Sequence, residues 1–167
     1  MAKLLLDSMC GRIARWLRFL GFDVVYAQDM EDDDIIKVAR STARVIVTRD
    51  RGLHLKALKL GLPSILLTST NHVKNMAVIL RSLDVLPSLP PVKTRCPLCN
   101  SPLIEVKAED VKELLPSSNI ATRYDKFWIC PSCDKVYWIG SHWKNIKKVL
   151  DEILKEMREE CDENCSR

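Results

Sequence analysis

The sequence lacks any long hydrophobic run. No stretch approaches the roughly 18 apolar residues that a membrane-spanning helix requires, which argues against a membrane protein. The first residues, MAKLLLDSMCGR, contain only three consecutive leucines, too few for the hydrophobic segment of a signal peptide. We therefore expect a cytoplasmic protein that has no membrane partner.

Aromatic residues are also scarce, at 6% of the 167 residues. Four of them, Trp128, Tyr137, Trp138 and Trp143, nevertheless lie close together in the last third of the chain. The overall composition, with 47% hydrophobic and 29% charged residues, is that of a globular protein. The length suits one domain with a small second unit, and the shift in aromatic content indicates such a division.

Neither sign of charge dominates strongly. The 26 lysines and arginines and the 22 aspartates and glutamates give a net charge of +4. Residues 1–150 carry the positive excess, whereas residues 151–167 hold three basic and seven acidic groups. A basic body with an acidic end is compatible with nucleic-acid binding but does not establish it.

Short apolar runs alternate with helical patterns through the first half of the chain. Strands are expected at 3–7, 23–27, 44–50 and 64–68, and helices at 10–20, 35–39, 53–60 and 73–83. Ser8 is expected to cap the first helix, and Gly21 and Gly61 to end the first and third helices. Continuous apolar strands that alternate with helices predict an α/β fold, a doubly wound parallel sheet with helices on both faces.

Two features suggest how the second half is organised. The segment 86–91 contains three prolines, so it continues neither a helix nor a strand, and we place a linker at 87–92. From Trp143 onward, apolar residues again recur at helical spacing, which predicts a C-terminal helix that packs back on one of the two units.

Carboxylates follow three of the predicted strands. Asp7 and Asp50 each end a strand, and an acidic run at 31–34 follows the second strand. The carboxyl ends of parallel strands meet at one edge of the sheet, where α/β proteins bind ligands. Clustered carboxylates repel one another unless a cation such as Mg²⁺ or Mn²⁺ lies among them. The chemistry suited to such a site is metal-assisted hydrolysis of a phosphodiester, with Asp7, Asp50 and either Asp33 or Asp34 as catalytic acids.

A purely structural interpretation of these acids stays open. An aspartate at the end of a strand often caps the following helix, and Asp50 stands in that position before Arg51. An acidic run such as 31–34 is commonly the solvated start of a helix. Thr48, two residues before Asp50, is the polar neighbour most suited to lie on the same face as that acid.

Four arginines flank the acids and are candidate phosphate contacts. Arg12 and Arg15 lie three residues apart on the first helix, and Arg49 and Arg51 bracket Asp50. Guanidinium groups suit phosphate recognition, so we expect these four side chains to bind substrate. The alternative is that they merely neutralise the acids in ordinary ion pairs.

The cysteines carry the strongest motif. Cys96 and Cys99, and thirty residues later Cys130 and Cys133, form two Cys-Pro-x-Cys pairs. Two such pairs give four thiolates, which is typical of a closed structural Zn²⁺ site, with iron as the less favoured occupant. Asn100 and Asp134 follow the pairs and tolerate the left-handed backbone of a tight turn. The remaining cysteines, Cys10, Cys161 and Cys165, are interpreted as free thiols, with Cys10 buried.

The segment 137–143, Tyr-Trp-Ile-Gly-Ser-His-Trp, follows the second cysteine pair. Its aromatic side chains are suited to stacking on unpaired bases, or they fill the small core of a zinc ribbon, and we favour the core for Trp138. His142 either makes an ordinary hydrogen bond or contacts phosphate beside the carboxylate edge.

Taken together, these motifs resemble a known family. The first strand with Asp7, the acids 31–34 and Val-Thr-Arg-Asp50 resemble the acidic motifs of PIN-domain ribonucleases. The segments 7–18, 48–51 and 137–143 resemble more narrowly the PIN-like branch with a C-terminal zinc ribbon, which also forms the C-terminal region of Mut-seven exonucleases. The resemblance extends from Lys3 to about Ile146.

The resemblance implies Mg²⁺- or Mn²⁺-dependent cleavage of RNA, with Asp7, an acid of the cluster and Asp50 as metal ligands. It also implies a division into a PIN-like nuclease domain (1–86), the linker, a zinc ribbon (93–142), and a C-terminal helix with an acidic tail (143–167). Many PIN enzymes carry a further acid after the fourth strand, but here residues 68–71 read Thr-Ser-Thr-Asn. This places a second catalytic metal position in doubt.

Our leading hypothesis is therefore a metal-dependent ribonuclease that acts on single-stranded or structured RNA. The main alternative is a non-catalytic adaptor that binds RNA or the ribosome and whose acids hold no metal. A thiol or iron electron carrier is a third class, and it would be recognised by its visible absorbance.

Overall fold

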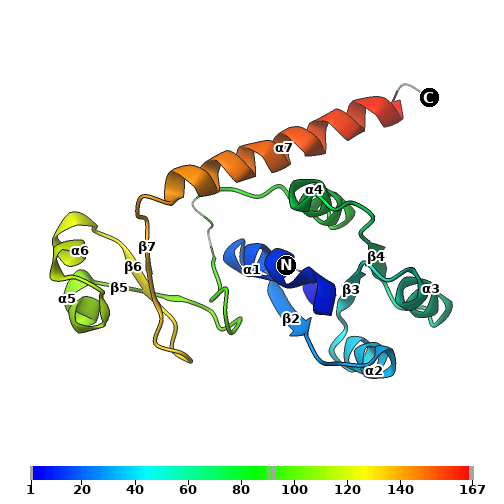
Figure 1. The fold of residues 1–167 in the computed structure, drawn as a ribbon, viewed down its shortest axis with the longest axis horizontal. Helices are drawn as coiled ribbons and strands as arrows, with labels where there is room; N and C mark the ends of the chain where they lie inside the picture. Colours follow the sequence, from blue (N-terminus) through cyan, green and yellow to red (C-terminus); the bar gives the residue numbers. More distant parts are fainter. Residues whose placement is uncertain (1, 90, 92, 166–167) are drawn as a thin grey trace.

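The structure, a computed structural model, describes residues 2–89, 91 and 93–165, with the side chains of 118 and 160–165 left out. Figure 1 shows a parallel sheet flanked by helices on one side of the molecule and a smaller antiparallel sheet on the other. A long C-terminal helix begins beside the smaller sheet and extends over the part of the molecule that contains the parallel sheet. None of the described helices is long and apolar enough to cross a membrane.

The larger sheet contains four parallel strands, β1 (Lys3–Asp7), β2 (Asp23–Ala27), β3 (Val45–Thr48) and β4 (Ser64–Leu66). Their order is β2-β1-β3-β4, so the chain first moves outward from β1 and then returns to its other side. The loops after β1 and β3 therefore leave the sheet in opposite directions, and ligands of open α/β sheets bind at such switch points. The four predicted strands are confirmed, although β3 and β4 are shorter than expected, and Asp50 lies in the turn after β3.

Helices cover both faces of this sheet, as a doubly wound fold requires. They are η1 (Ser8–Cys10), α1 (Gly11–Phe19), α2 (Asp32–Thr42), α3 (Arg51–Lys59) and α4 (His72–Ser82). Leu4 and Leu6 of β1 pack with α1 and α4, whereas Leu5 packs with α2 and α3. Successive side chains of a strand point to opposite faces, and a strand covered on both sides must be apolar throughout. The predicted α/β class is confirmed.

The start of the first helix differs from the prediction. A short turn, η1, precedes α1, and Asp7 caps that turn: its Oδ1 accepts a hydrogen bond of 3.0 Å from the Met9 backbone N, whereas α1 itself follows Cys10, which makes no side-chain capping bond. Ser8 itself lies within η1, so the prediction that it caps the helix is wrong, because the extended residue before the first turn is the strand-ending aspartate. Gly21 and Gly61 do end their helices, with φ of 93° and 71°, values that glycine adopts without strain.

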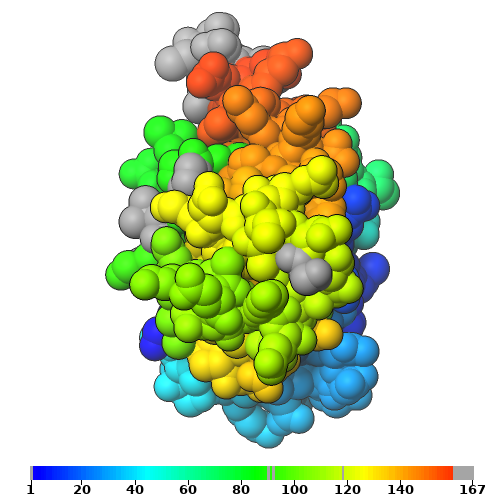
Figure 2. All heavy atoms as spheres, turned by 90° about the vertical axis from the view of Figure 1, so that its left-hand side faces the viewer, coloured from blue at the N-terminus to red at the C-terminus, as the bar shows by residue number. Residues whose placement is uncertain are grey.

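The smaller sheet is antiparallel, in the order β5 (Ile104–Val106), β6 (Phe127–Ile129) and β7 (Val136–Trp138). Between β5 and β6 the chain forms three short helices that the sequence pattern does not predict, α5 (Ala108–Val111), η2 (Lys112–Leu114) and α6 (Ser118–Arg123). Figure 2 shows this insertion, in lime and yellow, as the outer surface of the ribbon. Two apolar side chains of this smaller unit, Phe127 in β6 and Val111 in α5, are fully buried.

The C-terminal helix, α7 (Trp143–Cys165), packs on the α/β unit. Its residues Leu150, Ile153 and Met157 are buried in the same core as Met76 and Leu80 of α4. The helix therefore connects the ribbon to the sheet, and Figure 1 shows it running over α4.

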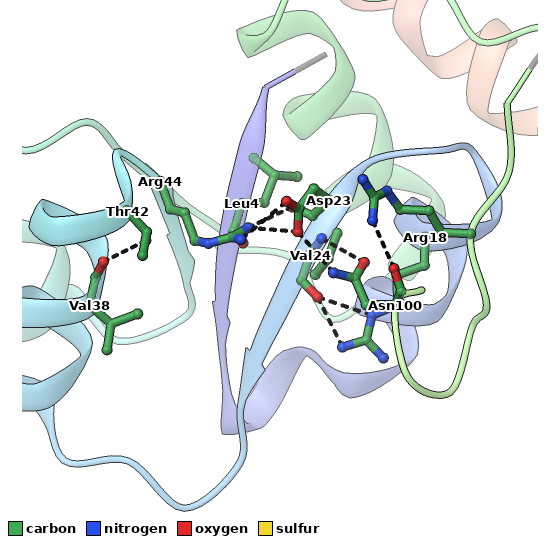
Figure 3. Close-up of polar contacts among 9 residues, drawn as sticks. Leu4, Arg18, Asp23, Val24, Val38, Thr42, Arg44 and Asn100 are labelled. Atoms are coloured by element: carbon green, nitrogen blue, oxygen red, sulfur yellow. Dashed lines mark hydrogen bonds and ion pairs between the residues drawn. The ribbon is translucent and has the colours of Figure 1, made fainter. Parts of the chain in front are cut away.

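A buried arginine, Arg18, joins the first cysteine loop to the α/β unit. Figure 3 shows it close to Val24 and Asn100. Arg18, 8% exposed at the end of α1, donates to the carbonyl of Val24 in β2 and to the carbonyls of Pro97 and Leu98. The two loop carbonyls lie 3.0 and 2.8 Å from the same guanidinium nitrogen. The loop between two cysteines is thus fixed by a side chain of the first helix.

Asn100 completes this junction from the ribbon side. Its Oδ1 accepts from the Val24 backbone N at 2.9 Å, and its Nδ2 donates to Asp23 at 2.8 Å. Arg44 forms an ion pair with the same Asp23 at 2.9 Å. Burial alone would raise the pKa of Asp23, but the hydrogen bonds from Arg44 and Asn100 outweigh it and hold that pKa below its usual value.

Candidate functional site

Asp7 lies at the carboxyl end of β1 and is only 6% exposed. Besides the bond from Met9, its Oδ2 accepts hydrogen bonds from the Thr48 hydroxyl and, at 3.1 Å, from the Arg49 backbone N. An ionised carboxylate offers about four lone-pair sites, so these three donors fix the orientation of Asp7.

Thr48 connects the two predicted catalytic acids. The side chain is fully buried at the end of β3. Its hydroxyl donates to Asp7 and accepts a hydrogen bond of 2.8 Å from the backbone N of Asp50. One hydroxyl therefore sets both the orientation of Asp7 and the turn that begins at Asp50.

Asp50 is exposed and caps α3. Its Oδ1 accepts from the Leu53 backbone N at 3.0 Å, which confirms the structural role that the sequence left open. Its other carboxylate oxygen makes no hydrogen bond to any residue that the structure describes. Capping and ligand binding are compatible here, because each uses a different oxygen atom.

The acidic run at 31–34 occupies the start of α2 and is exposed throughout. Asp33 pairs with Lys56 of α3 at 2.6 Å, and Asp34 pairs with Lys37 at 3.0 Å. The hydrogen bond from Lys56 lowers the pKa of Asp33. In the described part of the chain, no compact group of three or more metal-ligating side chains includes these acids with Asp7 and Asp50.

The four predicted zinc ligands do form such a group. The sulfur atoms of Cys96, Cys99, Cys130 and Cys133 all lie within 4.8 Å of one another. Three of their separations are 3.3, 3.6 and 3.8 Å. With Zn–S bonds of about 2.3 Å, a tetrahedral site requires sulfur atoms about 3.8 Å apart, so the cluster can hold such an ion.

The backbone around the thiols supports this arrangement. Asn100 and Asp134 adopt the expected left-handed conformation, with φ of 72° and 53°. Hydrogen bonds from Ser101, together with one from Cys130, lower the pKa of Cys99 to about 6, which favours the thiolate that binds metal. Burial raises the pKa of Cys130, and a cation among the sulfurs would reverse that effect.

A comparison with protein-family models identifies the chain. The model of the Mut7-C RNAse domain matches residues 2–150. The chain belongs to the Mut7-C RNAse domain family. The match confirms the resemblance and covers the parallel sheet, the ribbon and the start of α7. A search of curated proteins found no match, and neither did a search of solved structures.

Membership of the Mut7-C family suggests a ribonuclease-like function, with RNA as the substrate.

The four arginines predicted to bind phosphate differ in their exposure to solvent. Arg49 is half-buried beside Asp7, and Arg12, Arg15 and Arg51 are exposed. Burial lowers the pKa of His72 at the start of α4, and the charge of Arg12 adds to this effect, so Arg12 lies near that helix end.

His142 lies away from the carboxylate edge. With Trp138 and Trp143 it lines a cavity that also contains Phe19, at the end of α1, whereas Asp7 precedes the start of that helix. Trp138 is half-buried and packs against the fully buried Phe127, its cross-strand partner, with ring centroids 6.5 Å apart.

Sequence reasoning missed two residues that shape the acidic edge. The Tyr26 hydroxyl donates to the Ser8 carbonyl at 2.6 Å, and a Cβ atom on Gly11 would lie only 2.9 Å from that hydroxyl oxygen. Buried Asn75 donates to the Ser69 carbonyl at 2.9 Å and so holds the loop after β4. The sequence signal for the close approach of Tyr26 was Gly11, a residue without a side chain at the start of α1.

Replacing Thr48 with valine should disturb both acids at once. The substitution removes the donor to Asp7 and the acceptor for the Asp50 N–H, so we expect a loss of about 1–3 kcal/mol in the free energy of unfolding. If the acids bind metal, the kcat for RNA cleavage should fall by about 10–100-fold with little change in KM. Thr48→Ser keeps the hydroxyl, so its stability and its kcat should be close to those of wild type. Equal losses in the two variants would contradict the role of the Thr48 hydroxyl in connecting the two acids.

Proposed function

We propose that this Mut7-C protein is a Mg²⁺- or Mn²⁺-dependent ribonuclease whose ion is held by Asp7 and Asp50. The proposal rests on the Thr48 hydroxyl, which donates a hydrogen bond to Asp7 and accepts one from the Asp50 backbone N. These residues lie at the switch point between β1 and β3.

The donor set suits a hydrated ion. Mg²⁺ commonly uses one or two carboxylates and keeps several water ligands, and one carboxylate oxygen of Asp50 has no hydrogen-bond partner among the described residues. Such an ion supplies an activated water and neutralises charge on the phosphodiester. Either Asp33 or Asp34 would help to hold the ion, after it separates from its exposed lysine partner.

The positive side chains have distinct parts in this proposal. Arg49 is fixed next to Asp7 by its own backbone bond and is suited to the phosphate at the reacting position. Exposed Arg12, Arg15 and Arg51 would bind neighbouring phosphates of the RNA. Zn²⁺ in the four-cysteine site would hold the ribbon and take no part in the chemistry, because a closed site has no open ligand position.

The direct test is cleavage of end-labelled single-stranded RNA by zinc-loaded protein, with and without added Mn²⁺. Wild type should cut only with the added ion, and Asp7→Asn should cut at least about a hundredfold more slowly while still binding RNA. Omission of Mn²⁺ is a better control than EDTA alone, since EDTA also competes for zinc.

The alternative is a non-catalytic adaptor for RNA or the ribosome. Two observations favour it: residues 68–71 supply no carboxylate after β4, and Asp33 and Asp34 already have lysine partners. RNA retarded on a gel by wild type, with no cleavage under any Mg²⁺ or Mn²⁺ condition, would support the adaptor and reject the enzyme.

A further inference from the structure

An apolar cavity of about 310 Å³ opens where the ribbon meets α1 and α7. Aromatic side chains from four elements line it: Phe19, Trp128, Tyr137, Trp138 and Trp143. All five are half-buried, so each keeps part of its ring accessible. The volume lies at the lower end of the range of small-molecule sites, about 300–1,000 Å³.

The aromatic walls are held in place before any ligand arrives. The Phe19 and Trp143 rings meet edge to face, with centroids 5.9 Å apart. A Cβ atom on Gly140 would lie 2.8 Å from the indole nitrogen of Trp138, so the turn after β7 closes directly against that ring. One side of Trp138 packs against the buried Phe127 of the ribbon, with ring centroids 6.5 Å apart, and Trp138 also lines the cavity.

Polar groups gather immediately beside the aromatic cavity. An adjoining cavity of about 310 Å³ shares Trp138 and His142 and is also lined by Arg123, Asn119 and Ser141. Arg123 and His142 are exposed, and the His142 ring makes no hydrogen bond to any residue that the structure describes. An apolar aromatic slot therefore lies next to an available cation and several hydrogen-bonding groups.

We propose that these two cavities bind one unpaired nucleotide of RNA. The base stacks among the aromatic rings, and its phosphate contacts Arg123 and His142, since base stacking and cationic groups are the features that proteins use for single strands. A duplex holds its bases inside and cannot fill the aromatic slot, so the site selects RNA with an unpaired segment.

The positive charge of the surrounding residues favours RNA over other ligands that could occupy an apolar cavity. Residues 93–150 carry ten basic and six acidic side chains, an excess that attracts a polyanion. A second copy of this chain would bring the same positive surfaces together, which is unfavourable. The site and Asp7 lie at opposite ends of α1, whose nine residues span about 13 Å. The nucleotide bound in the cavities is therefore a different nucleotide from the one whose phosphate would react at Asp7.

The inference rests on the proposed function only in taking RNA as the ligand. It is tested by tryptophan fluorescence with a short oligoadenylate and an abasic oligoribonucleotide of equal length, on zinc-loaded wild type without added Mg²⁺ or Mn²⁺. Three of the four tryptophans line the cavity, so oligoadenylate should quench their emission. The abasic strand should bind about tenfold more weakly and leave the emission unchanged.

Variants locate the two halves of the site. Trp138→Leu should lose about tenfold in affinity for oligoadenylate, and Trp138→Phe, which keeps an aromatic face, should restore most of it. Arg123→Gln should weaken both strands, whereas Arg40→Gln, an exposed cation at the end of α2, should weaken neither by more than about twofold.

Equal affinity for the two strands, or self-association that Trp138→Leu abolishes, would overturn the inference. Failure of the proposed function has a different signature. Oligoadenylate would then bind and quench normally, but no RNA would be cut with Mn²⁺. Conversely, Mn²⁺-dependent cleavage with equal binding of both strands would reject the nucleotide site alone.

Discussion

Removal of the metal ion from the four-cysteine cluster should unfold the ribbon. Structural zinc contributes about 10–16 kcal/mol to the folding of small zinc domains, and few buried apolar residues, chiefly Phe127 and Val111, would remain to hold this one. We expect Cys130→Ser, or titration with a chelator, to abolish amide protection in β5, β6 and β7. Hydrogen exchange measured along the chain would show this loss directly.

The matched control is Cys10→Ala, which removes a buried thiol outside the cluster. Burial and the nearby Asp7 charge raise the pKa of Cys10, which disfavours the thiolate form that binds metal. This variant should keep one zinc ion per chain and an intact ribbon. Unchanged exchange in the ribbon after complete metal removal would contradict a structural role, and visible absorbance of the purified protein would indicate iron.

Arg18→Ala should be the most damaging single change on the surface between ribbon and sheet. It leaves the carbonyls of Val24, Pro97 and Leu98 without their donor, and each buried unsatisfied group costs about 1–3 kcal/mol. We expect the free energy of unfolding to fall by about 3–5 kcal/mol, measured by urea denaturation. Zinc affinity should fall by about tenfold, because the same guanidinium fixes the backbone between two ligands.

Arg15→Ala provides the comparison, since Arg15 lies on the same helix but is exposed. Its removal should change the free energy of unfolding by no more than about 0.5 kcal/mol. Arg18→Lys should recover only part of the loss, because one ammonium cannot reach both β2 and the cysteine loop. If Arg18→Ala were as stable as Arg15→Ala, the junction would not contribute to folding.

The parallel sheet was predictable because its strands are apolar on both faces. In a strand such as Leu4–Leu6, apolar side chains point to both faces, so helices must cover the sheet on each side. The glycines at 21 and 61 marked the ends of two helices. The four-cysteine cluster was predictable for a similar reason. The spacing within each cysteine pair, followed by Asn100 or Asp134, already defines the turn that brings two thiols together.

The short helices α5 and α6 could not be found in this way. With four and six residues, they contain too few turns to show a helical period. The burial of Arg18 was hidden because an arginine on an amphipathic helix normally faces solvent, and only the distant segment 97–100 shows why it does not. Long-range partners of this kind leave no local pattern.

The acidic edge shows where sequence reasoning stops. Strand ends placed Asp7 and Asp50 together, but the pattern did not show that Thr48 connects them or that Asp33 has Lys56 as a partner. The division into 1–86, 87–92, 93–142 and 143–167 stays a prediction, although α7 packs on the α/β unit.

The central claim is that Asp7 and Asp50 act as one metal-binding unit in RNA cleavage. A double-mutant cycle on the single-turnover cleavage rate tests it with wild type, Asp7→Asn, Asp50→Asn and the double variant. Each single change should lower the rate by about two to three orders of magnitude, and the double variant should be no slower than the slower single one. Effects that multiply in the double variant, or a fully active Asp50→Asn, would contradict the claim.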